Sequence, residues 1–243
     1  MVAISPHVTN IKTSFRGLLR TFFRHALVPL ALPISLSAAC VAAVSVAGWL
    51  MGFEVRLQLY SIPLLFAGPP LMVVVAAGAC LWVLLRERPK QPTRFLLHKL
   101  HRDWKTGARI VRGLPVIFIY PVFFGAFTSY KSTLGKIVPF HFDAQAAALD
   151  RFLHGGDAWK FFAVVLAHPL ITFLINFFYN VWFLRMYFLV AFVAFMVADL
   201  KLRVNYLTAF TLCWVIIGMV AATLLASVGP CYYAHFYNSG SFA

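Results

Sequence analysis

Long apolar runs constrain the fold of this chain more than any other feature of its sequence. A bilayer core of about 30 Å takes about 20 residues of helix, because backbone polar groups find no water to bond inside it. Five runs approach or exceed that length, and with 62% hydrophobic and 12% charged residues the 243-residue chain is far from the composition of a soluble domain. We therefore predict an all-α, polytopic transmembrane bundle. The basic segment 1–25 precedes one membrane domain, 26–243, with crossings near residues 26–52, 69–85, 114–130, 169–198 and 207–228.

Prolines bear on where two of these helices begin. Proline suits the first turn of a helix and disrupts its interior. Gly68-Pro69-Pro70 therefore predicts that the second crossing starts at Pro69 and that residues 57–67 lie at the interface. The third crossing carries Pro115 and Pro121 and is the weakest of the five patterns.

Lysine and arginine gather in three segments, which predicts the orientation. Residues 1–25, 86–109 and 201–203 are basic, whereas the loop 131–160 is nearly balanced in charge. Cytoplasmic loops carry the basic excess, so we predict a cytoplasmic N-terminus, with the loop 131–160 and the C-terminus outside. The net charge of +14 then indicates anionic lipids at the cytoplasmic face as partners rather than nucleic acid.

Two basic segments are typical of helices that lie on a membrane surface. NIKTSFRGLLRTFF (residues 10–23) repeats a basic residue every four positions beside apolar ones, and RFLLHKLHRDW (residues 94–104) has a similar mixture. We predict that both anchor the chain to the cytoplasmic surface of an integral, multi-pass membrane protein, for which a bacterial inner membrane is the expected location.

The predicted outside face carries a possible phosphate contact. Lys131 ends the third crossing, and six residues separate it from Val138-Pro139. Taken alone, such a lysine reaches to the headgroups as an anchor. The spacing nevertheless resembles the Lys-(six residues)-Arg-Pro pattern of type 2 phosphatidic acid phosphatases, with Val138 in place of the arginine. In that resemblance Lys131 contacts phosphate, and Lys136 offers a second charge.

Three further motifs resemble one branch of that superfamily, the inositolphosphotransferases related to inositol phosphorylceramide synthase. They are PFHFDAQAAALDRFLHGGDAW, FFYNVWF and SVGPCYY, which lie in this order within residues 127–233. The resemblance implies an active-site face on the outside, acting on a phospholipid phosphoester at the outer leaflet. Its candidate residues are Asp143, Asp150, Gly229, Pro230, Tyr232 and Tyr233.

The resemblance also implies catalytic residues that this chain does not supply. A histidine nucleophile would take the phosphoryl group, an aspartate would orient it, and a second histidine would protonate the leaving alcohol. In the family these groups follow the Gly-Pro-Cys-Tyr-Tyr segment, but His235 is the last histidine here and no Pro-Ser-Xaa-His segment follows. We therefore assign no catalytic residue and expect the chain to stop before its catalytic half. The mechanism requires no metal and no other cofactor.

Several polar residues leave two interpretations open. Asn176, Tyr179, Asn180 and Arg185 lie inside the fourth crossing and would form either a functional site or a structural lock between helices. Asp143 and Asp150 would share one face of a short helix, where a solvated face is favoured over a metal or inositol site. His154-Gly155-Gly156-Asp157 is typical of a turn.

Three functions are compatible with these patterns. The first is a membrane lipid phosphatase or phosphotransferase. The second is a catalytically inactive accessory or lipid-binding subunit, favoured by Val138 and the absent histidines. The third is a transporter component with Arg185 and the asparagines along its path. The oligomeric state stays open.

Overall fold

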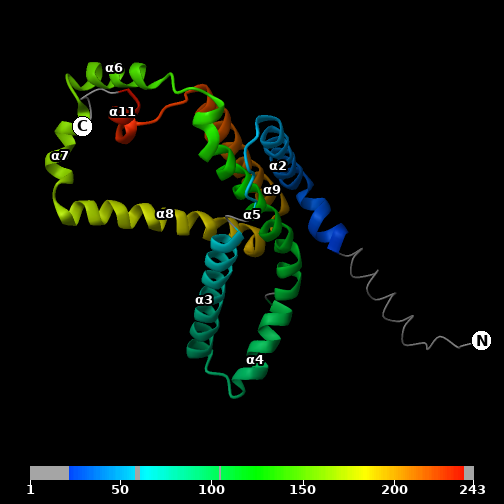
Figure 1. Cartoon of the computed structure of the whole chain (residues 1–243). Helices are drawn as coiled ribbons and strands as arrows, with labels where there is room; N and C mark the ends of the chain where they lie inside the picture. The colour runs from blue at the N-terminus through cyan, green and yellow to red at the C-terminus, as the bar shows by residue number, and fades with distance from the viewer. Residues whose placement is uncertain (1–21, 58–60, 104, 238–243) are drawn as a thin grey trace, which may run out of the picture.

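The computed structural model describes residues 22–57, 61–103 and 105–237, and every element in these ranges is helical (Figure 1). The long helices are α2 (Ala31–Met51), α3 (Ser61–Glu87), α5 (Thr106–Ile137), α8 (Pro169–Met196) and α9 (Leu200–Val215). The shorter ones are η1 (Phe23–Leu27), η2 (Val28–Leu30), α4 (Pro92–His98), η3 (Lys99–Asp103), α6 (Asp143–His154), α7 (Ala158–Leu166), η4 (Ile216–Ala221), α10 (Ala222–Leu224) and α11 (Pro230–Tyr237). Most of the predicted surface helix 10–23 lies outside the described residues.

Four helical stretches are long and apolar enough to cross a membrane. They are Val28–Met51, Thr106–Ile137, Pro169–Met196 and Leu200–Leu224. These stretches coincide with the first, third, fourth and fifth predicted crossings, so the prediction of an all-helical fold with several helices of membrane-spanning length is confirmed. The number of crossings and the side on which each end lies remain predictions from the sequence.

The prediction that a helix starts at Pro69 is wrong. α3 begins at Ser61 and continues through Gly68-Pro69-Pro70, so residues 61–67 are helical. Their location at the membrane interface stays a prediction. Pro63 occupies the first turn, where a missing N–H costs no helical hydrogen bond. Pro69, for which this role was predicted, lies six residues further along the helix.

The last predicted crossing is also displaced. α9 begins at Leu200 because Asp199 caps it, its Oδ1 accepting from the N–H groups of Lys201 at 2.8 Å and Leu202 at 3.3 Å. The helix then continues through η4 and α10 and ends at Leu224, before the predicted end at Val228. Ser227 to Gly229 are therefore free to form a turn.

The buried core lies where α5 packs against α2, α8 and α9. Aromatic rings of α5 and α9 interlock there, and the rings of Phe124 and Trp214 meet edge to face at 5.2 Å. The Tyr120 hydroxyl contacts the Leu207 carbonyl oxygen at 3.0 Å and the Thr211 hydroxyl at 2.9 Å. α5 is thus the central helix, and its two ends position the sites described below.

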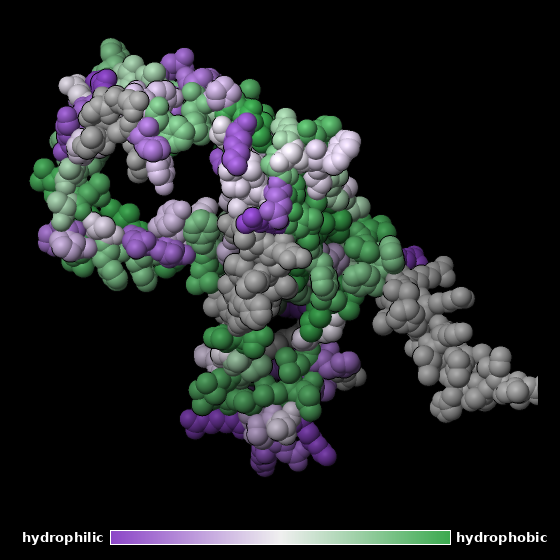
Figure 2. Space-filling model, in the orientation of Figure 1, coloured by the Kyte–Doolittle hydropathy of each residue, from purple (hydrophilic) through white to green (hydrophobic). Residues whose placement is uncertain are grey.

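α8 lies across the direction of α2 and α9 (Figure 1). Its C-terminal part, from Met186, is largely buried against the bundle, whereas its N-terminal half exposes apolar side chains such as Phe173 and Phe178. α6 and α7 form an arc from the end of α5 to the start of α8. Figure 2 shows hydrophilic side chains gathered at the α3–α4 end and near α6, with further ones near the middle of the view and on the outer end of α8, among extended apolar surface.

Candidate functional site

The start of α6 meets the turn between α10 and α11, which joins two of the three motifs that carry the family resemblance. Asp143 is almost fully buried, and both of its carboxylate oxygens accept hydrogen bonds from the turn. The donors are Ser227 Oγ at 2.5 Å, Val228 N at 3.0 Å, Gly229 N at 3.1 Å and the Tyr237 hydroxyl at 3.0 Å. The carboxylate is therefore surrounded by donors from its own chain.

Backbone contacts reinforce this junction. The N–H groups of His141 and Phe142 both donate to the Ala226 carbonyl oxygen at 3.2 Å. The Tyr237 hydroxyl also reaches the Phe140 carbonyl oxygen at 3.0 Å. We define this set of contacts, from Phe140 to Asp143 and from Ala226 to Tyr237, as the Asp143 lock.

The donors of the lock set the ionisation of Asp143. Burial alone would raise its pKa, but the hydrogen bonds from Ser227, Val228, Gly229 and Tyr237 favour the charged form, and the net result is a pKa below the ordinary value. An ionised carboxylate whose lone pairs are all engaged anchors a turn. It is a poor candidate for a metal ligand or a general base.

Asp150, the second predicted carboxylate, has a different partner. Its Oδ1 pairs with His154 Nδ1 at 3.1 Å on the partly exposed side of α6. Asp143 and Asp150 lie seven residues apart along a helix, about 10 Å, and do not share a ligand position. Within the described residues, no group of three or more histidine, cysteine or acidic side chains is arranged to hold a metal.

The other residues of the predicted face have structural positions. Gly229 adopts a φ of 80°, a left-handed conformation that favours glycine, and α11 begins directly after it at Pro230. Tyr232 is exposed, and the ring of Tyr233 lies 4.7 Å from that of Tyr237. The turn predicted at residues 154–157 is confirmed: Gly155 ends α6 with a φ of 67°.

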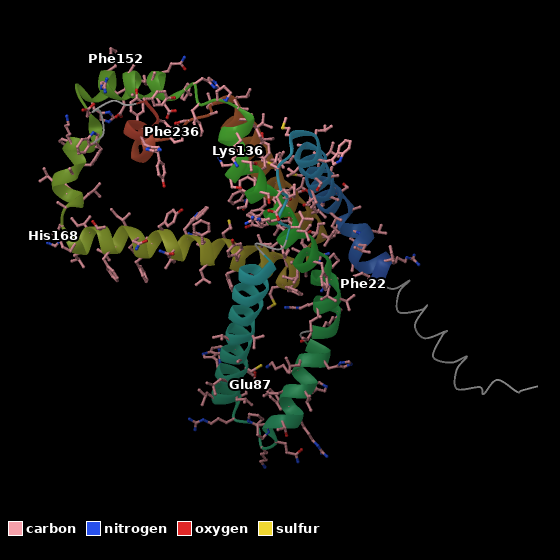
Figure 3. The ribbon with its side chains drawn as sticks, in the orientation of Figure 1. Phe22, Glu87, Lys136, Phe152, His168 and Phe236 are labelled. Atoms are coloured by element: carbon pink, nitrogen blue, oxygen red, sulfur yellow. The ribbon has the colours of Figure 1, made fainter. Side chains whose placement is uncertain are left out.

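A pocket of about 640 Å³ lies between the segment that follows α2 and the last turns of α5. Its polar lining combines two cations, one acid and four hydroxyls, namely Arg56, Lys136, Glu54, Thr128, Ser129, Ser132 and Thr133. Figure 3 shows Lys136 near the end of α5, on the side where Phe152 and Phe236 lie and away from Glu87. We call it the Arg56–Lys136 pocket.

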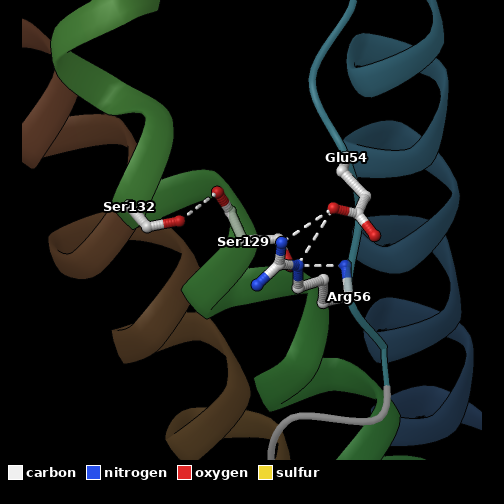
Figure 4. A network of polar contacts seen from close by, with 4 residues as sticks. All are labelled: Glu54, Arg56, Ser129 and Ser132. Carbon is white, nitrogen blue, oxygen red and sulfur yellow. Dashed lines mark hydrogen bonds and ion pairs between the residues drawn. The ribbon is translucent and has the colours of Figure 1, made fainter.

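Hydrogen bonds fix the two walls of this pocket to each other (Figure 4). The Arg56 N–H donates to Ser129 Oγ at 2.9 Å, and Ser129 Oγ donates to the Gly125 carbonyl oxygen at 2.8 Å. The Arg56 guanidinium pairs with Glu54 Oε2 through Nε at 3.0 Å and Nη2 at 2.9 Å. Lys136 makes no ion pair with any described residue, so the pocket retains one uncompensated positive charge.

The spacing along α5 explains which lysine lines the pocket. Ser129, Ser132, Thr133 and Lys136 stand at positions i, i+3, i+4 and i+7, which place them on one face of a helix. Lys131 is exposed and lies outside this lining, since five residues correspond to about 140° around the helix from Lys136. The structure therefore does not bring the two predicted phosphate contacts together.

Arg56 and the hydroxyls were missed in the sequence analysis. The periodic Ser129, Ser132, Thr133 and Lys136 pattern was a readable signal. The position of Arg56 was not, because it depends on a loop that follows α2.

The polar residues predicted inside the fourth crossing lie on two parts of α8. Asn180 Nδ2 donates to Asn176 Oδ1 at 3.0 Å and to its carbonyl oxygen at 2.7 Å, and Tyr179 is exposed beside them. Arg185 lines a second pocket of about 630 Å³, together with Tyr206 and several aromatic side chains. Asn176 and Tyr179 line a third, separate pocket. The four residues therefore do not form one site.

Comparisons with known proteins add no family to this description. No protein-family model matches the chain. Neither the curated proteins nor the solved structures contain a significant match to it. The functional argument therefore depends on the chemistry of the residues themselves.

Proposed function

We propose that this chain is a membrane protein that binds the phosphate of a lipid headgroup in the Arg56–Lys136 pocket. The observation that carries the proposal is the lining itself, in which two cations and a stripe of hydroxyls face one space and only one cation is paired. Arginine and lysine form charge-assisted hydrogen bonds with phosphate, and hydroxyls can rotate to donate to its oxygens.

The position of the pocket favours a lipid over a soluble anion. It lies at the end of α5, a helix long and apolar enough to span a membrane, where lysine side chains reach the headgroup layer. Met51, Phe53 and Ile137 supply an apolar part of the lining. Its volume of about 640 Å³ is within the usual range for ligand sites.

The sequence resemblance links this proposal to lipid phosphatases and phosphotransferases. In an enzyme of that class, the Arg56–Lys136 pocket would bind the phosphate of the substrate. Phosphoryl transfer by the histidine route would need a nucleophile, and none of the described side chains that line the pocket is a histidine. Asp143 could orient an imidazole only by giving up bonds of its lock. The proposed role of this chain is therefore lipid-phosphate binding, and phosphoryl transfer by the histidine route would take its nucleophile from outside the pocket.

Lys136→Met is expected to weaken binding of dioctanoyl phosphatidic acid to the purified protein about tenfold, because one charge-assisted contact contributes about 1.5 kcal/mol. Lys131→Met is the matched control on the same helix. Because Lys131 is exposed and lies outside the pocket, its replacement should change the dissociation constant less than about twofold. Titration calorimetry in detergent measures both. Equal losses in the two variants would contradict the assignment of the pocket.

Measuring phosphate release from the same lipid distinguishes an enzyme from a protein that only binds the lipid. Release that disappears in Lys136→Met would identify an enzyme, whereas binding without release would identify a lipid-binding subunit. Dioctanoylglycerol, which lacks the phosphate, serves as the control ligand. If it bound as tightly as the phosphatidic acid, the phosphate would not be what the pocket recognises.

A further inference from the structure

Arg203, near the start of α9, is buried, and two of its three guanidinium nitrogens lack a hydrogen-bond partner among the described residues. The residue is 2% exposed. In the described part of the chain, three buried side-chain polar atoms lack a hydrogen-bond partner: Arg203 Nε, Arg203 Nη1 and Thr208 Oγ1. Two of the three thus belong to a single guanidinium.

An arginine in this state requires an explanation. A guanidinium keeps its proton in proteins, so it cannot become neutral when it is buried, as a lysine or an aspartate can. An unpaired buried charge is strongly unfavourable. The acid one turn earlier, Asp199, does not pair with it, because its carboxylate caps the N–H groups of Lys201 and Leu202.

A second guanidinium increases the unfavourable charge at this point. Tyr120 of α5 contacts Thr211 of α9. Arg112 and Arg203 each stand eight residues before one member of this pair, on helices that run side by side, so their positive charges lie at the same level and repel each other. Arg112 Nε donates only to the Ala108 carbonyl oxygen of its own helix, at 3.1 Å. Arg109, one turn earlier, contacts Met196 Sδ at the end of α8. The neighbouring ends of α5, α8 and α9 therefore hold several positive charges, and no ion pair with a described residue compensates Arg112 or Arg203.

We propose that Arg112 and Arg203 form a second anion site, which takes the phosphate of a lipid headgroup at the end of the bundle opposite the Arg56–Lys136 pocket. One phosphate can accept bonds from both guanidinium groups, and its negative charge would offset their repulsion and the uncompensated charge of Arg203. The two sites lie about 25 to 36 Å apart along α5, since 17 residues separate Arg112 from Ser129 and 24 separate it from Lys136.

The surroundings favour a lipid as the source of the phosphate. Leu200 and Leu202 are exposed on either side of Lys201, so an apolar surface adjoins the charged one. This arrangement is typical of the layer where headgroups meet acyl chains. A free phosphate ion would use the arginines but not the leucines.

The experiment measures the melting temperature of the purified protein in detergent, in an Arg56→Met/Lys136→Met background that removes the proposed headgroup pocket. Dioctanoyl phosphatidic acid at about 100 times its dissociation constant should raise the melting temperature by about 5 °C. Arg203→Met in this background should abolish the rise. Because methionine removes an unpaired charge, the same variant should melt at an equal or higher temperature without lipid. Lys201→Met, two residues away and exposed, should keep the rise.

Each outcome bears on the second site separately from the first. A lower melting temperature of Arg203→Met without lipid, with the lipid-dependent rise intact, would make Arg203 a structural residue and overturn the proposal. An equal rise with inorganic phosphate would overturn the lipid as the source. If the background variant and the wild type respond equally to lipid, the Arg56–Lys136 pocket fails while the second site stands.

Discussion

Gly125→Ala is expected to destabilise the bundle by about 3 kcal/mol, which lowers the melting temperature by roughly 6 to 12 °C in a protein of this size. A Cβ at Gly125 would lie 2.4 Å from the Leu57 carbonyl oxygen and 2.7 Å from its carbonyl carbon. Both atoms are backbone, so no side-chain rotation can relieve the overlap. The segment that follows α2 would have to move away from α5.

That movement should also reach the Arg56–Lys136 pocket. The Arg56 N–H is bonded to Ser129 Oγ, and Ser129 is bonded in turn to the Gly125 carbonyl oxygen. A displaced Leu57 would pull Arg56 off this wall of the pocket. We therefore expect Gly125→Ala to weaken binding of dioctanoyl phosphatidic acid as well as to lower the melting temperature.

Gly107→Ala is the matched control on the same helix. No atom lies within 4 Å of a Cβ built at Gly107, and alanine favours a helix over glycine by up to about 1 kcal/mol. Its melting temperature should equal or exceed that of the wild type. Equal melting temperatures for both alanine variants would contradict the close contact between Leu57 and α5.

The helical fold was predictable because the length of each apolar run can be counted directly in the sequence. Any 20-residue apolar run must satisfy its own backbone, so four stretches could be located from composition alone. The helix ends were less predictable, since they depend on local competition. Pro63 rather than Pro69 occupies the first turn of α3, and the Asp199 cap starts α9 about two turns before the predicted crossing.

The candidate sites were only partly predictable, because each depends on contacts between distant segments. The sequence predicted that Asp143 and Gly229 lie on the same face. Only the structure shows that the Asp143 carboxylate accepts hydrogen bonds from the backbone N–H groups of Val228 and Gly229. Lys131 was ranked above Lys136 by a motif spacing, whereas the helical stripe with Ser132 and Thr133 selects Lys136. Arg203 stood among other cationic residues in the sequence, and its burial could not be read from them.

Asp143→Ala is expected to release the turn at residues 227–229 and destabilise the Asp143 lock by about 3 kcal/mol. The substitution leaves the N–H groups of Val228 and Gly229 without the acceptor they have in the wild type, and bonds to a charged group contribute about 1.5 to 3 kcal/mol each without adding fully. Hydrogen exchange at these two amides measures the effect. Asp150→Ala, whose carboxylate has only the partly exposed His154, should leave their exchange within about 0.5 kcal/mol of the wild type.

The pH dependence of the same amides tests whether the charge of Asp143 is what holds the turn. Its pKa in the folded protein lies below the ordinary 3.8, so its contribution to stability is fully present above about pH 5 and is lost as the pH falls through the folded value. After correction for intrinsic exchange rates, protection of Val228 and Gly229 should therefore hold from pH 7 to about pH 5 and decline below it. In Asp143→Asn the protection should be low throughout and show no such decline. A wild-type protein that loses protection between pH 7 and pH 5 would point instead to a group that titrates in that range, and the carboxylate would then not be the anchor.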